Sequence, residues 1–180
     1  MIGANIEVKA RTHDWDAQRA LAEKLTGSQA TLIEQVDTFF QVPVGRLKLR
    51  KLGPDCGELI YYQRPEHLGP KLSDYSVTVT DRPDELHDTL AQALGVYGEV
   101  RKRRWLYISN AYGGYTRIHF DEVKGLGQYL ELEVVLRPEQ SPEDAERIAV
   151  ELRTALDIRD EDLIECAYMD LLTARSGGGL

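Results

Sequence analysis

The chain has 180 residues, of which 42% are hydrophobic and 29% charged, with a formal net charge of −8 at pH 7. This composition is typical of a globular protein of one domain, and the acidic charge disfavours a general nucleic-acid binder, since phosphate backbones attract basic surfaces. No apolar run approaches the roughly 18 residues of a membrane span. The two cysteines, Cys56 and Cys166, lie far apart without metal-type spacing. We therefore expect a cytoplasmic protein that binds neither nucleic acid nor membrane.

The first half of the chain predicts strands separated by two helices. Asp14 is a suitable N-cap for a first helix that ends at Gly27, and Pro83 opens a second helix that ends before Gly95. A turn at residues 53–55 separates two of the strands. The predicted strands span residues 4–11, 31–40, 44–52, 57–64 and 73–80.

The second half predicts three more strands and then two helices. The strands span residues 96–110, 115–123 and 128–136. Ser141 begins a helix that runs to about Leu156, because a capping serine is followed by a proline and acidic residues. A last helix is expected over residues 160–174, with Cys166 and Met169 in the core. We expect one domain over residues 1–175 and a flexible tail over residues 176–180.

Charged side chains recur at every second position on five of the predicted strands. Successive side chains of a strand point to opposite faces, so each strand has one apolar face and one ionic face. Nine of the 22 lysines and arginines lie on these ionic faces: Lys9, Arg11, Arg46, Lys48, Arg50, Arg64, Lys102, Arg104 and Arg117. An acidic protein that gathers its cations in this way is predicted to bind a small anion.

Two arrangements of these ionic faces remain open. A single strand of this kind is usually the solvated face of an open antiparallel sheet. Five such strands, with cations and acids sorted by strand, favour a sheet that closes around a charged interior, because solvated faces usually intersperse both signs. The fold class predicted is α+β, dominated by one antiparallel sheet.

An ordered set of motifs resembles a known family. The motifs are Asn5-Ile6-Glu7-Val8-Lys9, Gly45-Arg46-Leu47-Lys48-Leu49-Arg50, the pair Lys102 and Arg104, Arg117-Ile118-His119-Phe120-Asp121, Gly125-Leu126-Gly127, and Glu131-Leu132-Glu133. Together they resemble the CYTH superfamily, also called triphosphate tunnel metalloenzymes. Its members include class IV adenylate cyclases, thiamine triphosphatases and bacterial inorganic triphosphatases. The resemblance covers nearly the whole chain.

The resemblance implies a closed eight-stranded antiparallel β-barrel whose interior is a triphosphate tunnel, with helices packed outside. It implies phosphate contacts from Lys9, Lys48, Arg50, Lys102, Arg104 and Arg117, and from Arg11, Arg46 and Arg64 nearer the tunnel mouths. Mg²⁺ or Mn²⁺ would be held by Glu7, Glu131 and Glu133, with Asp121 as a fourth ligand. The catalytic residues implied are Glu7, Lys9, Arg104 and Asp121.

Three departures from the family pattern bear on the reaction. The first glutamate of the ExExK signature is Asn5, whose neutral amide predicts weaker metal binding. Hydrolytic members often carry a tyrosine after the Asp-Thr of the second strand, where this chain has Phe39 and Phe40. Many members have a lysine in the setting Glu58-Leu59-Ile60, where this chain has Ile60. Strict thiamine triphosphatase activity is therefore less expected.

The leading hypothesis is a metal-dependent enzyme acting on a small-molecule triphosphate, with hydrolysis of an inorganic or organic triphosphate favoured as the simpler reaction. A class IV-type adenylate cyclase, which converts ATP to cyclic AMP and pyrophosphate, is the first alternative. A binding protein that holds polyphosphate or a nucleotide without turnover is the second, motivated by Asn5, Phe39 and Ile60. The sequence leaves the oligomeric state open, and a homodimer is one alternative.

Overall fold

The computed structural model describes residues 2–63 and 71–177. The strands in this part of the chain are β1 (Ile2–Arg11), β2 (Thr31–Phe40), β3 (Arg46–Gly53), β4 (Cys56–Gln63), β5 (Lys71–Thr80), β6 (Val96–Ser109), β7 (Tyr115–Val123) and β8 (Gly127–Val135). The α-helices are α1 (Trp15–Thr26), α2 (Pro83–Leu94), α3 (Pro142–Ala155) and α4 (Tyr168–Gly177). Two short 3-10 helices, η1 (Ala111–Gly113) and η2 (Asp160–Asp162), complete the elements. None of the described helices is both long and apolar enough to cross a membrane.

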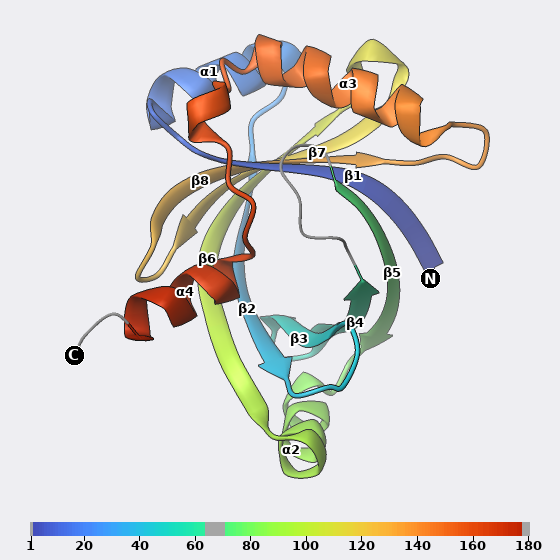
Figure 1. The fold of residues 1–180 in the computed structure, drawn as a ribbon, viewed down its shortest axis with the longest axis vertical. Coiled ribbons are helices and arrows are strands. Elements are labelled where there is room, and N and C mark those ends of the chain that lie inside the picture. Colours follow the sequence, from blue (N-terminus) through green and yellow to red (C-terminus); the bar gives the residue numbers. More distant parts are fainter. Residues whose placement is uncertain (1, 64–70, 178–180) are drawn as a thin grey trace.

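The strands form one antiparallel sheet that closes into a barrel, in the order β1-β5-β4-β3-β2-β6-β7-β8 (Figure 1). The closing pair is β1 with β8, which are in register from Asn5 opposite Val135 to Arg11 opposite Tyr129. Closure gives every strand two hydrogen-bonded neighbours and removes the exposed edges of an open sheet. The predicted eight-stranded antiparallel barrel with helices outside is confirmed.

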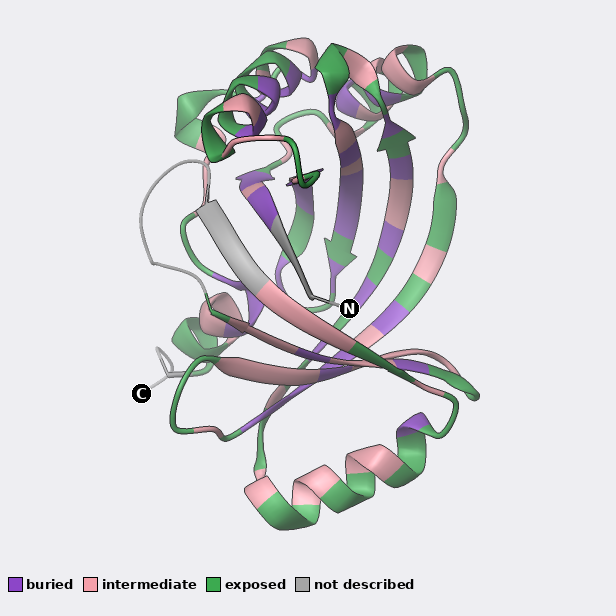
Figure 2. Cartoon of the chain, turned by 90° about the vertical axis from the view of Figure 1, so that its right-hand side faces the viewer, coloured by how far each residue is buried: buried purple, intermediate pink, exposed green. Residues whose placement is uncertain are grey.

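The main hydrophobic core lies outside the barrel, between its wall and two helices. On β1, Ile6, Val8 and Ala10 face outward and are almost completely buried. They pack with the apolar face of α3, including Ile148 and Leu152. Figure 1 shows α1 and α3 lying together across β1, β7 and β8. Figure 2 shows the buried positions concentrated on the strands beneath these helices.

A smaller apolar cluster joins α4 to one end of the barrel. It consists of Phe39, Val100, Val123, Leu126, Tyr129, Tyr168 and Met169. Gly98 of β6 leaves space for this contact, because a Cβ there would lie 2.5 Å from the Cε atom of Met169. The contact places α4 against β6 beside the barrel opening (Figure 1).

The helix starts predicted from capping residues are confirmed for two helices. Asp14 accepts a hydrogen bond from the backbone N–H of Ala17 at 3.1 Å. Ser141 and Asp144 form a reciprocal capping box at the start of α3. Gly27 ends α1 in the left-handed region, at φ 65°. These ends are fixed by local hydrogen bonds, which explains why the sequence alone locates them.

The predicted start of the last helix is wrong. Residues 160–162 form only a 3-10 turn, and α4 begins at Tyr168 and continues through Gly177, two residues into the predicted tail. The segment before α4 runs along β1 instead, where the N–H of Ile164 donates to the carbonyl of Lys9 at 2.9 Å. Cys166 is exposed rather than in the core, whereas Met169 is buried as expected. The rest of the predicted tail lies outside the described residues.

Candidate functional site

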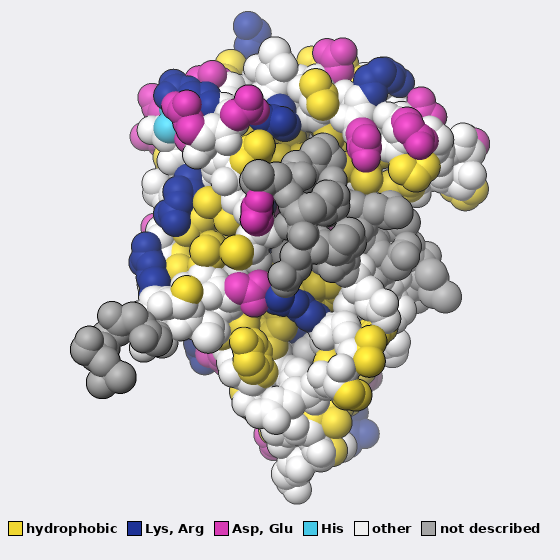
Figure 3. All heavy atoms as spheres, in the orientation of Figure 1, with side chains coloured by type: hydrophobic (Ala, Val, Ile, Leu, Met, Phe, Trp, Pro, Cys, Tyr) yellow, Lys and Arg dark blue, Asp and Glu magenta, His cyan; other side chains and the backbone are white. Residues whose placement is uncertain are grey.

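The inward faces of the strands surround a cavity of about 710 Å³. Most of the residues predicted from the charged alternation line it: Glu7, Lys9, Lys48, Arg50, Lys102, Arg104, Arg117, Glu131 and Glu133. The ionic faces therefore enclose a tunnel, and the alternative of an open sheet with solvated charges is excluded. On the outer surface, acidic and basic side chains are interspersed over the helical end of the molecule (Figure 3).

Three predicted site residues lie outside the cavity lining, and a fourth lies outside the described residues. Arg46 forms an ion pair of 2.9 Å with Asp170 of α4, and Arg11 lies 5.3 Å from the centre of the Tyr129 ring. Asp121 is fully buried behind the cavity wall. Arg64 lies outside the described residues.

Asp37 organises the cations on the β2–β3 wall. Its carboxylate accepts hydrogen bonds from Lys48 at 2.8 Å and from Arg50 at 3.2 Å. Burial would raise the pKa of Asp37, but Lys48 and Arg50 hold the pKa far below its usual value. Sequence reasoning did not assign this residue to the site. The available signal was its position on the inward face of β2, two residues from the lining residues Gln35 and Phe39.

Arg104 is held by two carboxylates. It donates to Asp121 at 2.6 and 2.5 Å and to Glu131 at 2.5 Å, while Lys102 donates to Asp121 at 3.0 Å. Burial opposes ionisation of Asp121, but the adjacent Arg104 and Lys102 lower its pKa to about 2. Both Asp121 oxygens are thus occupied by cations, which fix the direction in which Arg104 and Lys102 point.

A pair of carboxylates faces the tunnel from β1 and β8. Glu7 and Glu133 are direct cross-strand partners, a position in which like charges repel. Arg117 offsets this repulsion by donating to Glu133 at 2.8 and 2.6 Å, and Lys9 lies 3.5 Å from Glu7. Burial would raise the pKa of Glu133, but Arg117 keeps that pKa below its ordinary value. Glu133 therefore remains anionic at neutral pH.

These acidic groups fit a partly protein-coordinated divalent cation. Asn5 donates its side-chain N–H to Glu133, and its buried Oδ1 atom has no hydrogen-bond partner. No cluster of three or more His, Cys, Asp or Glu within residues 2–63 and 71–177 has the geometry of a complete metal site. Mg²⁺ commonly takes one or two carboxylates and completes its octahedron with water and phosphate oxygens. Glu7, Glu133 and Asn5 Oδ1 match that requirement.

The tunnel cations are crowded enough to affect each other. Burial lowers the pKa of Lys48 to about 8, with Asp37 opposing the change and Arg50 and Lys102 adding to it. Burial, and then Arg104, also lowers the pKa of Lys102. Their protonated forms lack enough neighbouring negative charge, so an anion in the tunnel would stabilise them.

The remaining wall of the tunnel is apolar and aromatic. Phe39, Ile60, Tyr62, Tyr75 and Val77 line it from β2, β4 and β5. Ile60 therefore faces the interior, where the family pattern predicted a lysine. Ala167, directly before α4, and Tyr168, its first residue, complete the lining, a contribution that sequence reasoning missed because neither residue lies on a charged strand.

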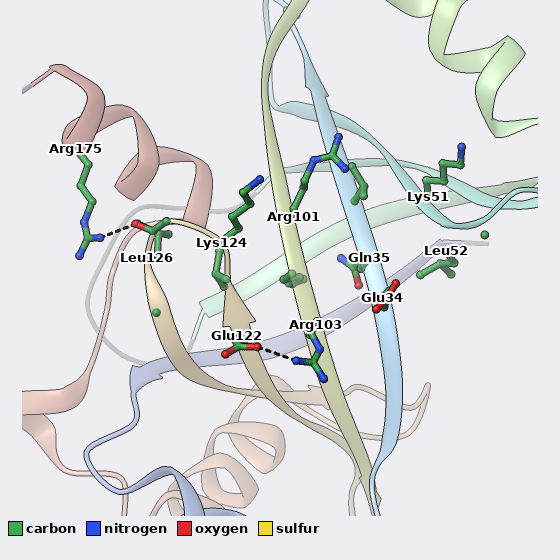
Figure 4. A pocket seen from close by; sticks show the side chains of 16 residues that line it. Glu34, Gln35, Lys51, Leu52, Arg101, Arg103, Glu122, Lys124, Leu126 and Arg175 are labelled. Atoms are coloured by element: carbon green, nitrogen blue, oxygen red, sulfur yellow. Dashed lines mark hydrogen bonds and ion pairs between the residues drawn. The ribbon is translucent and has the colours of Figure 1, made fainter.

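A second hollow, of about 940 Å³, lies beside β2 and β6 (Figure 4) and shares Gln35, Leu52 and Lys102 with the tunnel lining. It is lined by exposed cations from several elements, but acidic groups and carbonyls already engage some of them. Arg103 donates to Glu122 at 3.4 Å, and Arg175 donates to the carbonyl of Gly125 at 2.6 Å. Solvent screens charges at such a surface, so the enclosed tunnel is the stronger candidate for an anion site.

Comparisons with known proteins agree with this architecture. The family model described as CYTH domain matches residues 3–168. The PH1012 protein from Pyrococcus horikoshii OT3 is similar at 23% identity, with a TM-score of 0.80, over 93% of this chain and 98% of that chain. A putative adenylate cyclase from Vibrio parahaemolyticus is 18% identical, with a TM-score of 0.77, over 95% and 98%. The putative adenylyl cyclase HpAC1 from Hippeastrum, described as having a dominant triphosphatase activity, is 16% identical, with a TM-score of 0.66, over 96% of both chains. No curated protein matches the sequence.

Proposed function

Because the chain belongs to the CYTH domain family, we propose that it is a metal-dependent enzyme that hydrolyses a triphosphate-containing substrate inside the tunnel. The observation that carries this proposal is the group of crowded cations lining the cavity, half-buried on β3 and buried on β6, together with the carboxylate pair on β1 and β8. Such a tunnel suits a highly charged anion that arrives with a divalent cation. The similarity to a putative cyclase and to a protein described as a triphosphatase supports the same substrate class.

In this proposal, the cations hold the phosphate groups. Arg50 and Arg104 offer planar guanidinium groups that match two phosphate oxygens at once, while Lys48 and Lys102 act as point charges. Lys9 and Arg117 add charge from the opposite wall. Asp37 and Asp121 orient these cations before the substrate arrives, so little reorganisation is needed when the anion binds.

Glu7 and Glu133, with the Oδ1 atom of Asn5, would hold Mg²⁺ or Mn²⁺. The bound cation would neutralise charge that develops on the phosphoryl oxygens and would polarise the attacking water. Glu131 accepts from both Lys9 (2.9 Å) and Arg104 (2.5 Å), and Asp121 is fully engaged by cations. We therefore assign Glu131 and Asp121 to positioning cations and keep their contribution to metal binding as a prediction to be tested. Glu133 is also engaged by Arg117 and Asn5, so it would hold the metal beside these contacts, through the lone pair that Oε2 has left.

Catalysis in this tunnel rests on positioning and charge stabilisation. Water attacks the terminal phosphorus while the bridging P–O bond breaks, and the negative charge spreads over the equatorial oxygens and the leaving group. Arg104 and the neighbouring lysines stabilise that charge in an enclosed site, where each contact is stronger than at the surface.

Cyclisation of ATP is the second candidate, and the apolar wall favours it. Phe39, Ile60 and Tyr62 lie in the same cavity as the cations and give an aromatic base a surface to pack on. The same wall accommodates the organic part of another triphosphate ester. The products formed decide between the two reactions.

The test incubates the protein with inorganic triphosphate, thiamine triphosphate or ATP, each with Mg²⁺ and with Mn²⁺. Phosphate, pyrophosphate and cyclic AMP are measured in the same reactions. Glu7→Gln is the disabled variant, and Glu122→Gln, on the outer face of β7, is the matched control. We expect phosphate release that Glu7→Gln reduces at least tenfold and Glu122→Gln leaves unchanged.

Cyclic AMP with pyrophosphate would instead identify a cyclase. Binding without turnover of any substrate would identify a non-catalytic triphosphate-binding protein. Turnover that is equal in the wild type and in Glu7→Gln would overturn the assignment of the metal site.

A further inference from the structure

His119 is a buried imidazole in the wall of the tunnel. It lies on β7, lines the cavity and is 5% exposed. Its Nδ1 atom is completely buried and makes no hydrogen bond to the described residues, while Oε2 of Glu131 lies 3.8 Å away. Burial removes the hydrogen bonds that a polar group makes with water, so a buried imidazole in a binding cavity requires an explanation.

The imidazole of His119 is neutral. Burial lowers its pKa from the ordinary value, and the positive charge of Arg104 lowers the pKa further, while Glu131 opposes the change. A neutral imidazole has a proton on one nitrogen and a lone pair on the other, and a neighbouring acceptor decides which nitrogen holds the proton. The Glu131 carboxylate lies on the Nδ1 side, so Nδ1 holds the proton and Nε2 keeps the lone pair.

Nε2 is the ring nitrogen that reaches the cavity. Nδ1 is closed off from solvent, whereas Nε2 is neither closed off in this way nor hydrogen-bonded within residues 2–63 and 71–177. The small exposed part of the side chain faces the space that His119 lines. The lone pair of Nε2 is therefore available to a hydrogen-bond donor inside the tunnel.

The carboxylates around this imidazole are already engaged by cations. Glu131 accepts from Lys9 at 2.9 Å and from Arg104 at 2.5 Å. Glu133 accepts from Arg117 at 2.8 and 2.6 Å. Nε2 differs from these oxygens because it is an acceptor without charge, which no donor of the described residues engages.

Two kinds of tunnel ligand are unsuited to this lone pair. Phosphate oxygens are themselves acceptors and repel it. Within the described residues, His119 belongs to no group of three or more His, Cys, Asp or Glu that could hold a metal ion. An O–H group is the remaining kind of partner, and in a site that hydrolyses a triphosphate the O–H group that is always needed is water.

The position of His119 suits a water molecule that attacks phosphorus. Its cross-strand partner is Glu131, and the next inward residue along β8 is Glu133, one of the carboxylates proposed to hold the metal. Arg104, which is proposed to contact phosphoryl oxygens, is close enough to lower the pKa of His119. His119 thus lies beside both the proposed metal position and the proposed phosphate position.

We propose that Nε2 of His119 accepts a hydrogen bond from the attacking water and directs a lone pair of its oxygen toward the terminal phosphorus. Glu131 orients the imidazole from the Nδ1 side. His119 is then the residue that orients the nucleophile, a task that the engaged cations and carboxylates do not perform. This inference rests on the proposed function, since it takes hydrolysis of a triphosphate as the reaction.

The test compares His119→Gln with His119→Asn. The amide of glutamine reaches about as far as Nε2 and restores an acceptor to the tunnel, whereas the shorter asparagine reaches only the position of Nδ1. The kcat and KM values are measured with Mg²⁺ and whichever of inorganic triphosphate, thiamine triphosphate and ATP the wild type hydrolyses fastest. Affinity for inorganic triphosphate is measured by titration calorimetry in EDTA, and thermal unfolding is recorded without ligand.

We expect His119→Asn to lower kcat about 100-fold, as when a reacting group is misplaced by about 1 Å. KM and the affinity for triphosphate should change by less than about twofold, because the phosphate contacts remain. His119→Gln should have a kcat at least about tenfold higher than His119→Asn. Both variants bury an amide, so a loss of stability that they share does not produce this difference.

The possible failures are distinguishable. If His119→Asn keeps the kcat of the wild type, the role of His119 is overturned while the proposed function stands. A loss confined to KM and affinity would show that His119 contacts phosphate instead of water, and equal kcat values in the two variants would show a purely structural role; either result contradicts the proposal. If the wild type hydrolyses none of the three substrates, the proposed function fails and this inference fails with it.

Discussion

The two faces of each strand in this barrel serve opposite purposes. The outward residues of β1, Ile6, Val8 and Ala10, lie at 1–2% exposure against the helical layer. The inward residues Glu7 and Lys9, which alternate with them, line the tunnel. One face buries apolar area, which stabilises the fold. The other buries charges, whose desolvation offsets most of what their mutual attraction supplies.

The difference shows where stability and function reside. A barrel filled with apolar side chains would need no carboxylates to hold its cations, and buried ion pairs are weak evidence for stability. Asp37, Asp121 and Glu131 each hold cations in the tunnel at hydrogen-bonding distance. We infer that the inner face is retained for binding, while the outer face with α1 and α3 supplies the core.

Replacing Arg104 should have the largest effect, because this inward residue contributes to both stability and function. Arg104→Ala leaves Asp121 buried beside only Lys102, and loss of one member of a buried ion pair costs roughly 3–5 kcal/mol. Phosphate release should fall about 10³-fold, as when a transition-state charge contact is lost. Urea denaturation and the phosphate assay measure the two effects. Unchanged stability would show that Asp121 is hydrated rather than enclosed.

Truncation of the outer core should separate stability from binding. Ile148→Ala removes a side chain that is 1% exposed between α3 and the barrel wall. The free energy of unfolding should fall by about 2–5 kcal/mol, because a cavity remains. Below the unfolding transition, triphosphate affinity should stay within about threefold of the wild type. A large loss of affinity in the folded protein would mean that the helical layer controls the tunnel.

A change at Asn5 tests whether the acidic wall formed by β1 and β8 binds the metal. Asn5→Glu places a third carboxylate beside Glu133, to which Asn5 donates. Repulsion should lower the stability of the metal-free protein by about 1 kcal/mol, while the added charge should strengthen Mn²⁺ binding. Thermal unfolding with and without Mn²⁺ measures both. If Mn²⁺ stabilises the variant no more than the wild type, the metal lies elsewhere.

Triphosphate affinity should fall as the pH rises through about 8. The pKa of Lys48 in the free protein is about 8, and a bound polyanion raises the pKa, so binding is strongest when Lys48 is already protonated below that value. Above it, binding requires uptake of a proton, and affinity declines by up to about tenfold per pH unit. Lys48→Arg stays charged and should show a weaker decline, with Lys102, whose pKa is also lowered, as the remaining source of the pH dependence. A pH dependence that is the same in both proteins would exclude Lys48 as its source.

The smallest effect is expected on the outer charged surface. Glu122→Gln breaks an exposed ion pair with Arg103, in which both side chains are about half exposed. Such pairs contribute roughly 0–1 kcal/mol, and the change lies outside the tunnel. Stability and phosphate release should therefore match the wild type closely. A clear loss of activity would assign a role to the outer hollow of Figure 4.

The alternation of charge predicted the ionic faces and favoured a closed sheet, because strand geometry alone determines which side chains share a face, whereas the eight-stranded barrel was implied by the family resemblance. Lys9, Lys48 and Arg104 were placed correctly in the tunnel on that basis. The role of Asp37 could not be predicted, since its partners Lys48 and Arg50 lie on a neighbouring strand whose register was unknown. α4 was misplaced because Leu163 and Ile164 pair with β1, a long-range contact that helix propensity does not contain.

The most direct test of the account is a crystal structure with inorganic triphosphate and Mn²⁺. The account predicts phosphate oxygens in contact with Lys48, Arg50 and Lys102 inside the barrel. Anomalous scattering should place Mn²⁺ beside Glu7 and Glu133. Triphosphate bound only on the outer surface around Arg101 and Lys124, with the tunnel ion pairs unchanged, would contradict it.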